Sequence, residues 1–314
     1  MKNIRVGVIG VGAMGNHHAR IYSELQDVEL VGVSDINAKA TAEIASTYNT
    51  DAFDDCVHLL KSDLDAVSIA VPTSLHKEIA LKAVKQGVHM LVEKPISDSL
   101  NSADEIIEAV RREKLKLMIG HIERFNATIL KLKKFISAGK LGHVLSISCR
   151  RVGPYPPRIR DVGIIIDLAV HDIDTITHIY GESALNVYAI GGNSFHIKED
   201  HASILLLYAD NKSGVVETNW LTPHKIRQLT VTGTEGVAHA DYLEQSLEIW
   251  REGEVIEVPI EKREPLRNEL EHFLCAIAND EEPSPSGVEG KSTLHVALSA
   301  IKSYETGKSV LLNA

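Results

Sequence analysis

The chain has 314 residues, a length that corresponds to about two domains of ordinary size. Its 43 acidic residues outnumber its 33 basic residues, and the formal net charge of −10 argues against general binding to nucleic acid. Hydrophobic residues make up 44% of the chain, as in a globular protein, but no apolar run reaches the length of a membrane helix and no signal-peptide pattern is present.

Strand and helix patterns alternate over the first 120 residues. Short β-branched and apolar runs predict strands at 4–9, 30–34, 66–71, 88–92 and 115–119. Helical patterns fall between them, at 17–25, 38–48, 76–86 and 99–114. This alternation predicts right-handed crossovers and an α/β domain with a doubly wound parallel sheet.

The pattern changes near residue 120. Longer runs, separated by turn residues, predict strands at 145–151, 184–191, 202–208, 214–221, 226–232 and 246–250. Helices are predicted at 127–138, 163–180, 266–279 and 291–306. We therefore expect residues 1–120 and 121–314 to form separate domains. The second is an α+β domain with an open, mostly antiparallel sheet, and its last helix is a candidate to pack back on the first domain.

A glycine motif follows the first strand and precedes the first helix. It reads Gly10-Val-Gly12-Ala13-Met14-Gly15, and Asp35 lies 20 residues after Gly15, at the end of the next strand. This context matches the dinucleotide-binding fingerprint, in which backbone amides hold a pyrophosphate and the carboxylate binds a ribose. A carboxylate at this position repels a ribose 2′-phosphate, so the sequence favours NAD over NADP.

Two further strand ends carry polar groups, at the edge of the sheet where such folds bind ligands. Pro72 and Thr73, with His76 close behind, follow one strand, and Glu93-Lys94-Pro95 follows another. Lys94 at the tip of its strand, next to a cofactor, is a candidate for proton transfer. The alternative is a solvated lysine in an ordinary turn.

A polar stripe runs along the predicted helix 163–180. Asp167, His171, Asp174 and His178 fall on one side of a helical wheel drawn at about 100° per residue. A histidine flanked by carboxylates suits a general base. Two alternatives are a polar face turned to water and a metal site. The three cysteines are far apart and form no CxxC pair, which fits a reducing cytoplasm and offers no zinc pattern.

Together and in this order, these motifs resemble the Gfo/Idh/MocA family of sugar and cyclitol dehydrogenases. The resemblance covers nearly the full chain. It implies a Rossmann domain followed by a domain whose open sheet packs against another subunit, as a homodimer or homotetramer, and no metal. The cofactor-binding residues that it implies are Gly10, Gly12, Ala13, Met14, Gly15, Asp35, Pro72, Thr73, His76, Glu93 and Lys94.

The resemblance also implies a mechanism. A substrate hydroxyl loses its proton to His171, Lys94 shares or relays the proton, and Asp167 orients the pair, while the adjacent carbon gives hydride to NAD. Lys94 and His171 can exchange roles. Within the family, residues 120–126, which include Arg124, resemble members that oxidise the 3-hydroxyl of a nucleotide sugar such as UDP-N-acetylglucosamine.

Basic residues gather around a Gly-Pro-Tyr-Pro-Pro segment. Arg150, Arg151, Arg158 and Arg160 are placed to bind a diphosphate, and Tyr155 to stack on a base. Trp220 and residues 224–227 are further candidates, although Trp220 suits a buried position equally well. The alternative is a basic loop paired with acidic surface or with a partner subunit. The expected substrate-binding residues are thus Lys94, Arg124, Tyr155, Arg158, Asp167 and His171.

Two competing functions stay open. The alternatives are a dehydrogenase of a free sugar or of a cyclitol like myo-inositol, and a non-catalytic sensor that binds a nucleotide and a partner protein. The presence of Lys94, Asp167 and His171 together argues against the sensor, because a sensor does not need all three.

Overall fold

The computed structural model describes residues 3–156 and 162–312. The chain divides into two compact units, the first made of Met1–His121 and Leu266–Lys291, the second of Ile122–Pro265 and Ser292–Ala314. A stretch near the C-terminus therefore belongs to the N-terminal unit. Within the described residues, no helix combines the length and the apolar character needed to cross a membrane.

The first unit is built on a parallel sheet. Its six strands lie in the order β3-β2-β1-β4-β5-β6. They span Ile4–Ile9 (β1), Val28–Ser34 (β2), Asp51–Phe53 (β3), Ala66–Ile69 (β4), His89–Glu93 (β5) and Leu117–Gly120 (β6). The order reverses between β1 and β4, so the carboxyl ends of these two strands flank the position where doubly wound folds bind their ligand. This arrangement confirms the predicted α/β domain.

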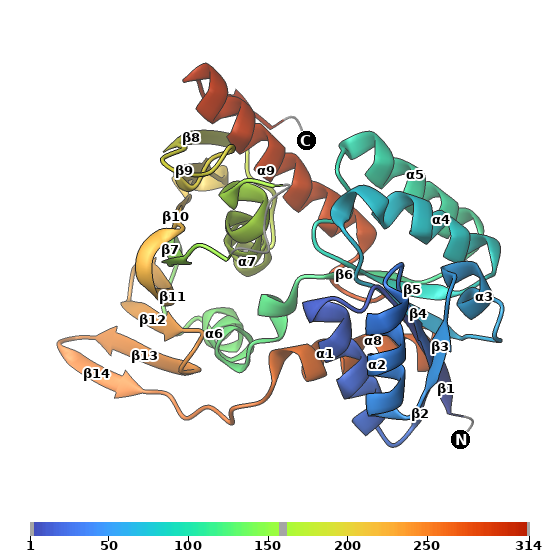
Figure 1. Ribbon diagram of the computed structural model, residues 1–314. Coiled ribbons are helices and arrows are strands. Elements are labelled where there is room, and N and C mark those ends of the chain that lie inside the picture. The colour runs from blue at the N-terminus through green and yellow to red at the C-terminus, as the bar shows by residue number, and fades with distance from the viewer. Residues whose placement is uncertain (1–2, 157–161, 313–314) are drawn as a thin grey trace. The chain divides into compact units, whose positions relative to one another are not determined.

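Helices cover both faces of this sheet (Figure 1). The helices α1 and α2 pack together, and α3 packs on α4, which in turn packs on α5. Their bounds are Ala13–Glu24 (α1), Ala38–Tyr48 (α2), Cys56–Leu60 (α3), His76–Lys85 (α4) and Leu100–Arg112 (α5). The helix α8 (Pro265–Ala278) reaches α1 through an ion pair between Arg267 and Glu24.

The second unit contains a mixed sheet of nine strands in the order β14-β13-β12-β11-β7-β10-β9-β8-β15. The strands are antiparallel except for β10 and β7, which pair in parallel. They span Val144–Pro154 (β7), Asn186–Gly192 (β8), His201–Leu207 (β9), Ser213–Asn219 (β10), Leu221–Gly233 (β11), Gly236–Asp241 (β12), Ser246–Arg251 (β13), Glu254–Glu257 (β14) and Val310–Leu311 (β15). The predicted open, mostly antiparallel sheet is confirmed.

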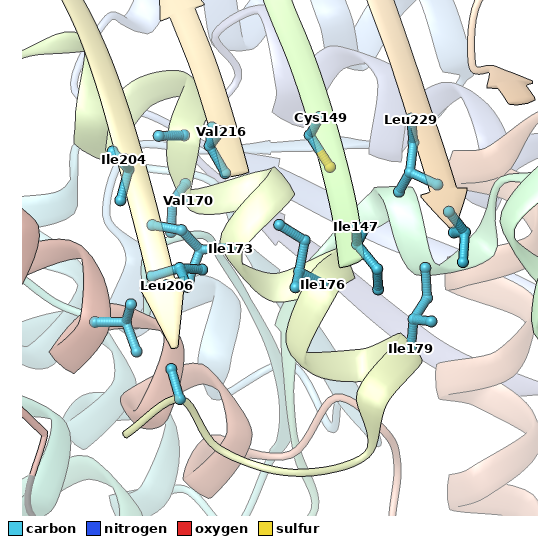
Figure 2. Close-up of a cluster of buried hydrophobic side chains, with 14 of the residues drawn as sticks. Ile147, Cys149, Val170, Ile173, Ile176, Ile179, Ile204, Leu206, Val216 and Leu229 are labelled. Atoms are coloured by element: carbon cyan, nitrogen blue, oxygen red, sulfur yellow. The ribbon is translucent and has the colours of Figure 1, made fainter. Parts of the chain in front are cut away.

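One face of this sheet is covered by helices α6 (Ala127–Ser137), α7 (Val170–Tyr180) and part of α9 (Gly287–Thr306). Along β9, residues alternate strictly between buried and exposed, because successive side chains in a strand point to opposite faces. Figure 2 shows the resulting core, in which strand residues such as Ile147 and Val216 face Ile173 and Ile176 of α7.

The structure adds elements that were not predicted, namely strands β3, β12, β14 and β15 and helix α3. Two further differences lie close to the candidate site. Helix α1 begins at Ala13, directly after Gly12, rather than at residue 17. The predicted helix 163–180 starts with a π-helical turn, Ile165–Ala169, before α7. A π turn holds more residues than an α turn, so a wheel drawn at a constant angle does not apply across it.

Candidate functional site

The glycine motif forms a tight turn between β1 and α1. Gly10 has a φ of +89°, and a Cβ there would lie 2.5 Å from the Ala70 carbonyl oxygen. A Cβ on Gly15 would collide with the carbonyl oxygen of Gly10. At Gly12, by contrast, an added Cβ would meet no atom within 4 Å. Gly10 and Gly15 therefore allow the turn to pack closely against neighbouring backbone, while the space beside Gly12 stays open.

This turn fits the phosphates of a dinucleotide. Gly12 is the N-cap of α1 and offers no side chain to the first amides of the helix. The first N–H groups of a helix have no acceptor within it, so those of Ala13, Met14 and Gly15 suit an anion at this end. The open side of Gly12 leaves room for the backbone to approach such a ligand.

Asp35 connects the end of β2 to the glycine turn. Its carboxylate accepts hydrogen bonds from the backbone N–H of Val11, at 2.8 Å, and of Asn37, at 2.9 Å. Each carboxylate oxygen keeps a further lone pair, and the side chain is partly exposed. Asp35 therefore fixes the turn and still has acceptors for ribose hydroxyls.

His76 joins the ends of two strands. Its Nδ1 lies 2.9 Å from the carbonyl oxygen of Pro95, and its Nε2 lies 2.9 Å from that of Val71. The ring is 1% exposed, and burial lowers its pKa. Both ring nitrogens thus face backbone, so His76 shapes the loops around a cofactor. Pro72 and Thr73 lie beside it, at the start of a short 3-10 helix, Thr73–Leu75.

Glu93 and Lys94 stand at the end of β5, and Glu93 is part of a buried hydrogen-bonded chain. Glu93 Oε1 lies 3.1 Å from His18 Nε2, His18 Nδ1 lies 3.0 Å from Ser68 Oγ, and Ser68 Oγ lies 2.8 Å from the Tyr22 hydroxyl. The other carboxylate oxygen, Oε2, accepts the backbone N–H of Lys94 at 3.2 Å.

An ionised Glu93 only accepts, so His18 donates to it from Nε2. Burial alone opposes ionisation of Glu93, but the hydrogen bond from His18, the charge of His18 and the charge of Lys94 outweigh it and lower the pKa of Glu93. A fixed negative charge therefore adjoins Lys94.

Asp167 and His171 lie at the start of the α7 segment in the second unit. Asp167 lies in the π turn and is 8% exposed, and His171 is partly buried in the first turn of α7. Turns of this kind are rare and are frequent at functional sites. The sequence Ile-Ile-Asp-Leu-Ala gives no signal for it. Lys94 belongs to the first unit and the Asp–His pair to the second.

The other members of the predicted polar stripe are engaged within the protein. Asp174 is 1% exposed and forms a two-point ion pair with Arg124, with both N–O distances 2.7 Å. Thr293 donates a third bond to Asp174. His178 lies 3.0 Å from Lys133 Nζ. The water-facing interpretation therefore fails for Asp174, and Arg124 has a structural partner that sequence reasoning did not assign.

The predicted arginine cluster is divided by the sheet. Arg150 is exposed and pairs with Glu217, whereas Arg151 is 2% exposed and binds Asp172, at 2.9 Å, and Glu123, at 2.7 Å. Neighbouring residues of a strand point to opposite faces, so Arg150 and Arg151 do not act together on one diphosphate. Arg158 and Arg160 lie outside the described residues.

Tyr155 packs in an aromatic cluster. Its ring centroid is 5.3 Å from those of both Phe195 and Trp220 and 5.6 Å from that of His196. Trp220 is 3% exposed, which bears out its buried interpretation. Among the described residues, no group of three His, Cys, Asp or Glu side chains is arranged to hold a metal ion.

Sequence reasoning missed the buried side chains that hydrogen-bond to Glu93 and to Arg151. His18, Ser68 and Tyr22 behind Glu93, and Glu123 and Asp172 around Arg151, are brought together by the tertiary fold. The position of His18, three residues beyond Gly15 in a helix, was the one available signal, because side chains three and four residues apart share a helix face.

Two family models match the chain. Residues 4–121 match the Gfo/Idh/MocA model described as "Oxidoreductase family, NAD-binding Rossmann fold", and residues 129–239 match the Gfo/Idh/MocA C-terminal domain. The first places an NAD-binding fold on the unit that carries the glycine turn, which agrees with the geometry of Gly10, Gly12 and Gly15.

Individual relatives match over nearly the whole chain. The UDP-N-acetylglucosamine 3-dehydrogenase of Acidithiobacillus ferrooxidans is 33% identical, with 95% of this chain and 96% of the relative covered. Its solved structure matches with a TM-score of 0.92, covering 98% of this chain and 99% of that one. The myo-inositol 2-dehydrogenase of Thermotoga maritima is 28% identical, with 98% of both chains covered. The chain belongs to the Gfo/Idh/MocA family and is an oxidoreductase with an NAD-binding Rossmann domain.

Proposed function

We propose that the protein oxidises the 3-hydroxyl of a nucleotide sugar such as UDP-N-acetylglucosamine, with NAD as the oxidant. The observation that carries this proposal is the 33% identity, over nearly the full length, to a relative named for that reaction. Inositol dehydrogenases at 28% identity make a free cyclitol the second candidate. The glycine turn and Asp35 would hold NAD, which when bound accepts a hydride from the carbon bearing the reacting hydroxyl.

The protein's own groups then have distinct tasks. His171 accepts the hydroxyl proton, and Asp167, held in the π turn four residues earlier, orients the pair of Lys94 and His171. Lys94 shares the proton, with its backbone held by the Glu93 carboxylate. Arg124 positions α7 through its ion pair with Asp174 rather than contacting the substrate. The proposal requires Lys94 and His171 to act on the same substrate.

A substrate panel tests this function. Purified protein with NAD is given UDP-N-acetylglucosamine, N-acetylglucosamine or myo-inositol, and the absorbance of reduced nicotinamide is followed. We expect turnover with the nucleotide sugar. Turnover with myo-inositol alone would show that the protein is a cyclitol dehydrogenase instead. Cofactor binding without turnover on any of these sugars would favour the sensor.

The proton acceptor is tested by substitution. His171→Gln should lower kcat by about two to four orders of magnitude, the usual contribution of general acid–base catalysis. NAD affinity should be unchanged, because the proposed cofactor contacts are the glycine turn and Asp35. His178→Gln, on the same helix but in contact with Lys133, is the matched control and should retain kcat. An equal loss of kcat in both variants would exclude His171 as the proton acceptor.

We also propose that NAD is preferred over NADP. Asp35 supports this preference, because its carboxylate is already placed beside the glycine turn, where a ribose phosphate would meet like charge. Asp35→Asn keeps an acceptor for one backbone N–H and removes the charge. The ratio of NAD to NADP affinity should fall about tenfold or more. An unchanged ratio, measured by calorimetry, would remove Asp35 from the ribose site.

We further propose that the open sheet binds a second copy of the chain. Its outer face carries Tyr188, Leu205 and Val215 in direct register on β8, β9 and β10, all exposed. A contiguous apolar patch of this kind is typical of an interface. Leu205→Asp should lower the mass measured by light scattering to that of a smaller species. Val288→Asp, at an exposed apolar residue outside this sheet, should leave the mass unchanged.

A further inference from the structure

The inner face of the second unit's sheet changes character along its strands. Leu229 and Val231 of β11 are buried in the apolar core, and Arg227 continues the same face of that strand. On β7, Cys149 is followed on this face by Arg151. The apolar core therefore ends in a polar region on these two neighbouring strands.

Two arginines meet in this polar region. Arg227 and Arg151 lie directly opposite each other in the antiparallel pairing of β11 and β7. Like charges in this arrangement repel, so a stable pair needs nearby anions. Arg151 has them, because Glu123 and Asp172 both bind its guanidinium.

Arg227 has no comparable partner. Within residues 3–156 and 162–312, neither a hydrogen bond nor an ion pair is recorded for its guanidinium. The side chain is half-buried, and burial together with the charge of Arg151 lowers the pKa of Arg227, while the charges of Glu123, Asp172 and Asp167 act in the opposite direction. Because none of these carboxylates forms a hydrogen bond with Arg227 within the described residues, its guanidinium keeps N–H donors for an anionic ligand.

A second observation points to the same place. Among the described residues, Arg151 Nη2 is buried and has no hydrogen-bond partner, although Arg151 as a whole is 2% exposed. The hydroxyl of Tyr242 is likewise buried and unpartnered, and the guanidinium of Arg151 lies 5.1 Å from the centroid of its ring. Buried donors without acceptors are rare in proteins, and they call for a ligand or an ordered water.

The region also adjoins the proposed proton acceptor. Asp172, which binds Arg151, directly follows His171 in α7. The charges of Asp167 and Asp172 are both near enough to act on the pKa of Arg227. Arg227 therefore lies near the chain segment that carries Asp167 and His171.

We propose that Arg227, backed by the unpartnered Nη2 of Arg151, binds the diphosphate of a nucleotide-linked substrate. This inference rests on the proposed function and gives it a specificity-determining residue. Of the predicted arginines, Arg151 stays in this site and Arg150 is excluded from it, because Arg150 lies on the outer face of the sheet. Arg227 takes the place of Arg150, because it lies on the inner face and its guanidinium offers N–H donors to an anion.

The test measures binding of UDP to the NAD-loaded protein by calorimetry, together with KM for UDP-N-acetylglucosamine. Arg227→Gln should weaken UDP binding and raise KM by about 10- to 100-fold, the loss expected for charge-assisted hydrogen bonds. NAD affinity and kcat should change little. Arg227→Lys should restore part of the UDP affinity. The matched control is Arg150→Gln, on the paired strand but on the outer face, and it should stay within about twofold of wild type.

The outcomes separate the two proposals. If the wild type binds UDP and Arg227→Gln binds it as well as Arg150→Gln does, the inference fails and the proposed function stands. If the wild type neither binds UDP nor oxidises the nucleotide sugar, the proposed substrate fails, and the inference fails with it. Circular dichroism of each variant confirms that a loss of binding does not come from unfolding.

Discussion

Two buried polar clusters, one in each unit, differ in how their hydrogen bonds are satisfied. In the first unit, Glu93, His18, Ser68 and Tyr22 form a chain in which each side chain bonds to the next. In the second, Arg151 binds two carboxylates and still keeps an unpartnered Nη2. The first arrangement is complete without a ligand, whereas the second retains hydrogen-bonding capacity.

This difference suits the tasks of the two units. A cofactor common to a whole family can be held by backbone, and here the contacts depend on glycines and on main-chain N–H groups fixed by Asp35. A substrate that varies within the family needs side chains that change without disturbing the fold. Unpartnered N–H donors of arginines on the inner face of the second unit's sheet meet that need. The cost is that charged side chains are buried.

The largest loss of stability is expected when the buried ion pairs of the second unit are removed. Arg151→Met removes a cation that two carboxylates share, and leaving a buried charge uncompensated costs about 3–5 kcal/mol. Denaturant unfolding should show this loss of stability. The double variant Arg151→Met with Asp172→Leu should recover part of it. Arg150→Met, with an exposed ion pair, should change stability by about 0.5 kcal/mol at most.

A smaller effect is expected from the hydrogen-bonded chain of the first unit. Ser68→Ala removes the hydrogen-bond partner of both Tyr22 and His18, so it should cost about 1–3 kcal/mol. Tyr22→Phe removes one hydrogen bond at the end of the chain and should cost about 1 kcal/mol. A Tyr22→Phe loss greater than that of Ser68→Ala, in the same unfolding assay, would contradict the central position of Ser68 in the chain.

The smallest effect is on the pH dependence of stability. Burial lowers the pKa of His76 in the folded state, so below its unfolded value of 6.5 the unfolded chain binds a proton that the folded chain resists. Stability should therefore fall as the pH drops from 7 to 5.5, by at most about 1.4 kcal/mol per unit from this group. His76→Asn should flatten the slope. His58→Asn, at an exposed histidine, should leave the slope as it is.

Local sequence signals explain why much of the first unit could be predicted. A strand, a glycine turn and a helix follow one another within residues 4–24, and each depends on neighbours in sequence. The predicted start of α1 was late because Gly12 caps the helix without a capping side chain. In the second unit, alternation along β7 and β9 revealed strands and their buried faces.

The sequence was a poorer guide to which charged side chains lie together, because their pairing depends on the tertiary fold. Arg150 and Arg151 are adjacent in sequence and look like one cluster, but the pleat of β7 sends them to opposite faces. Asp174 shares a predicted stripe with His171, yet it pairs with Arg124, 50 residues away. A helical wheel drawn at a constant angle also does not apply across the π turn Ile165–Ala169, which holds more residues than an α turn.

By itself, the sequence determined most of the longer strands and helices, the glycine turn and the residues whose chemistry suits proton transfer, because these depend on contacts within a few residues. The tertiary structure decided which charges are paired and which are left for a ligand. Arg151 and Arg227 are 76 residues apart in sequence, and only the register of β7 and β11 places them opposite each other. Pairing of this kind is set by the packing of the whole sheet, so no segment of the chain encodes it alone.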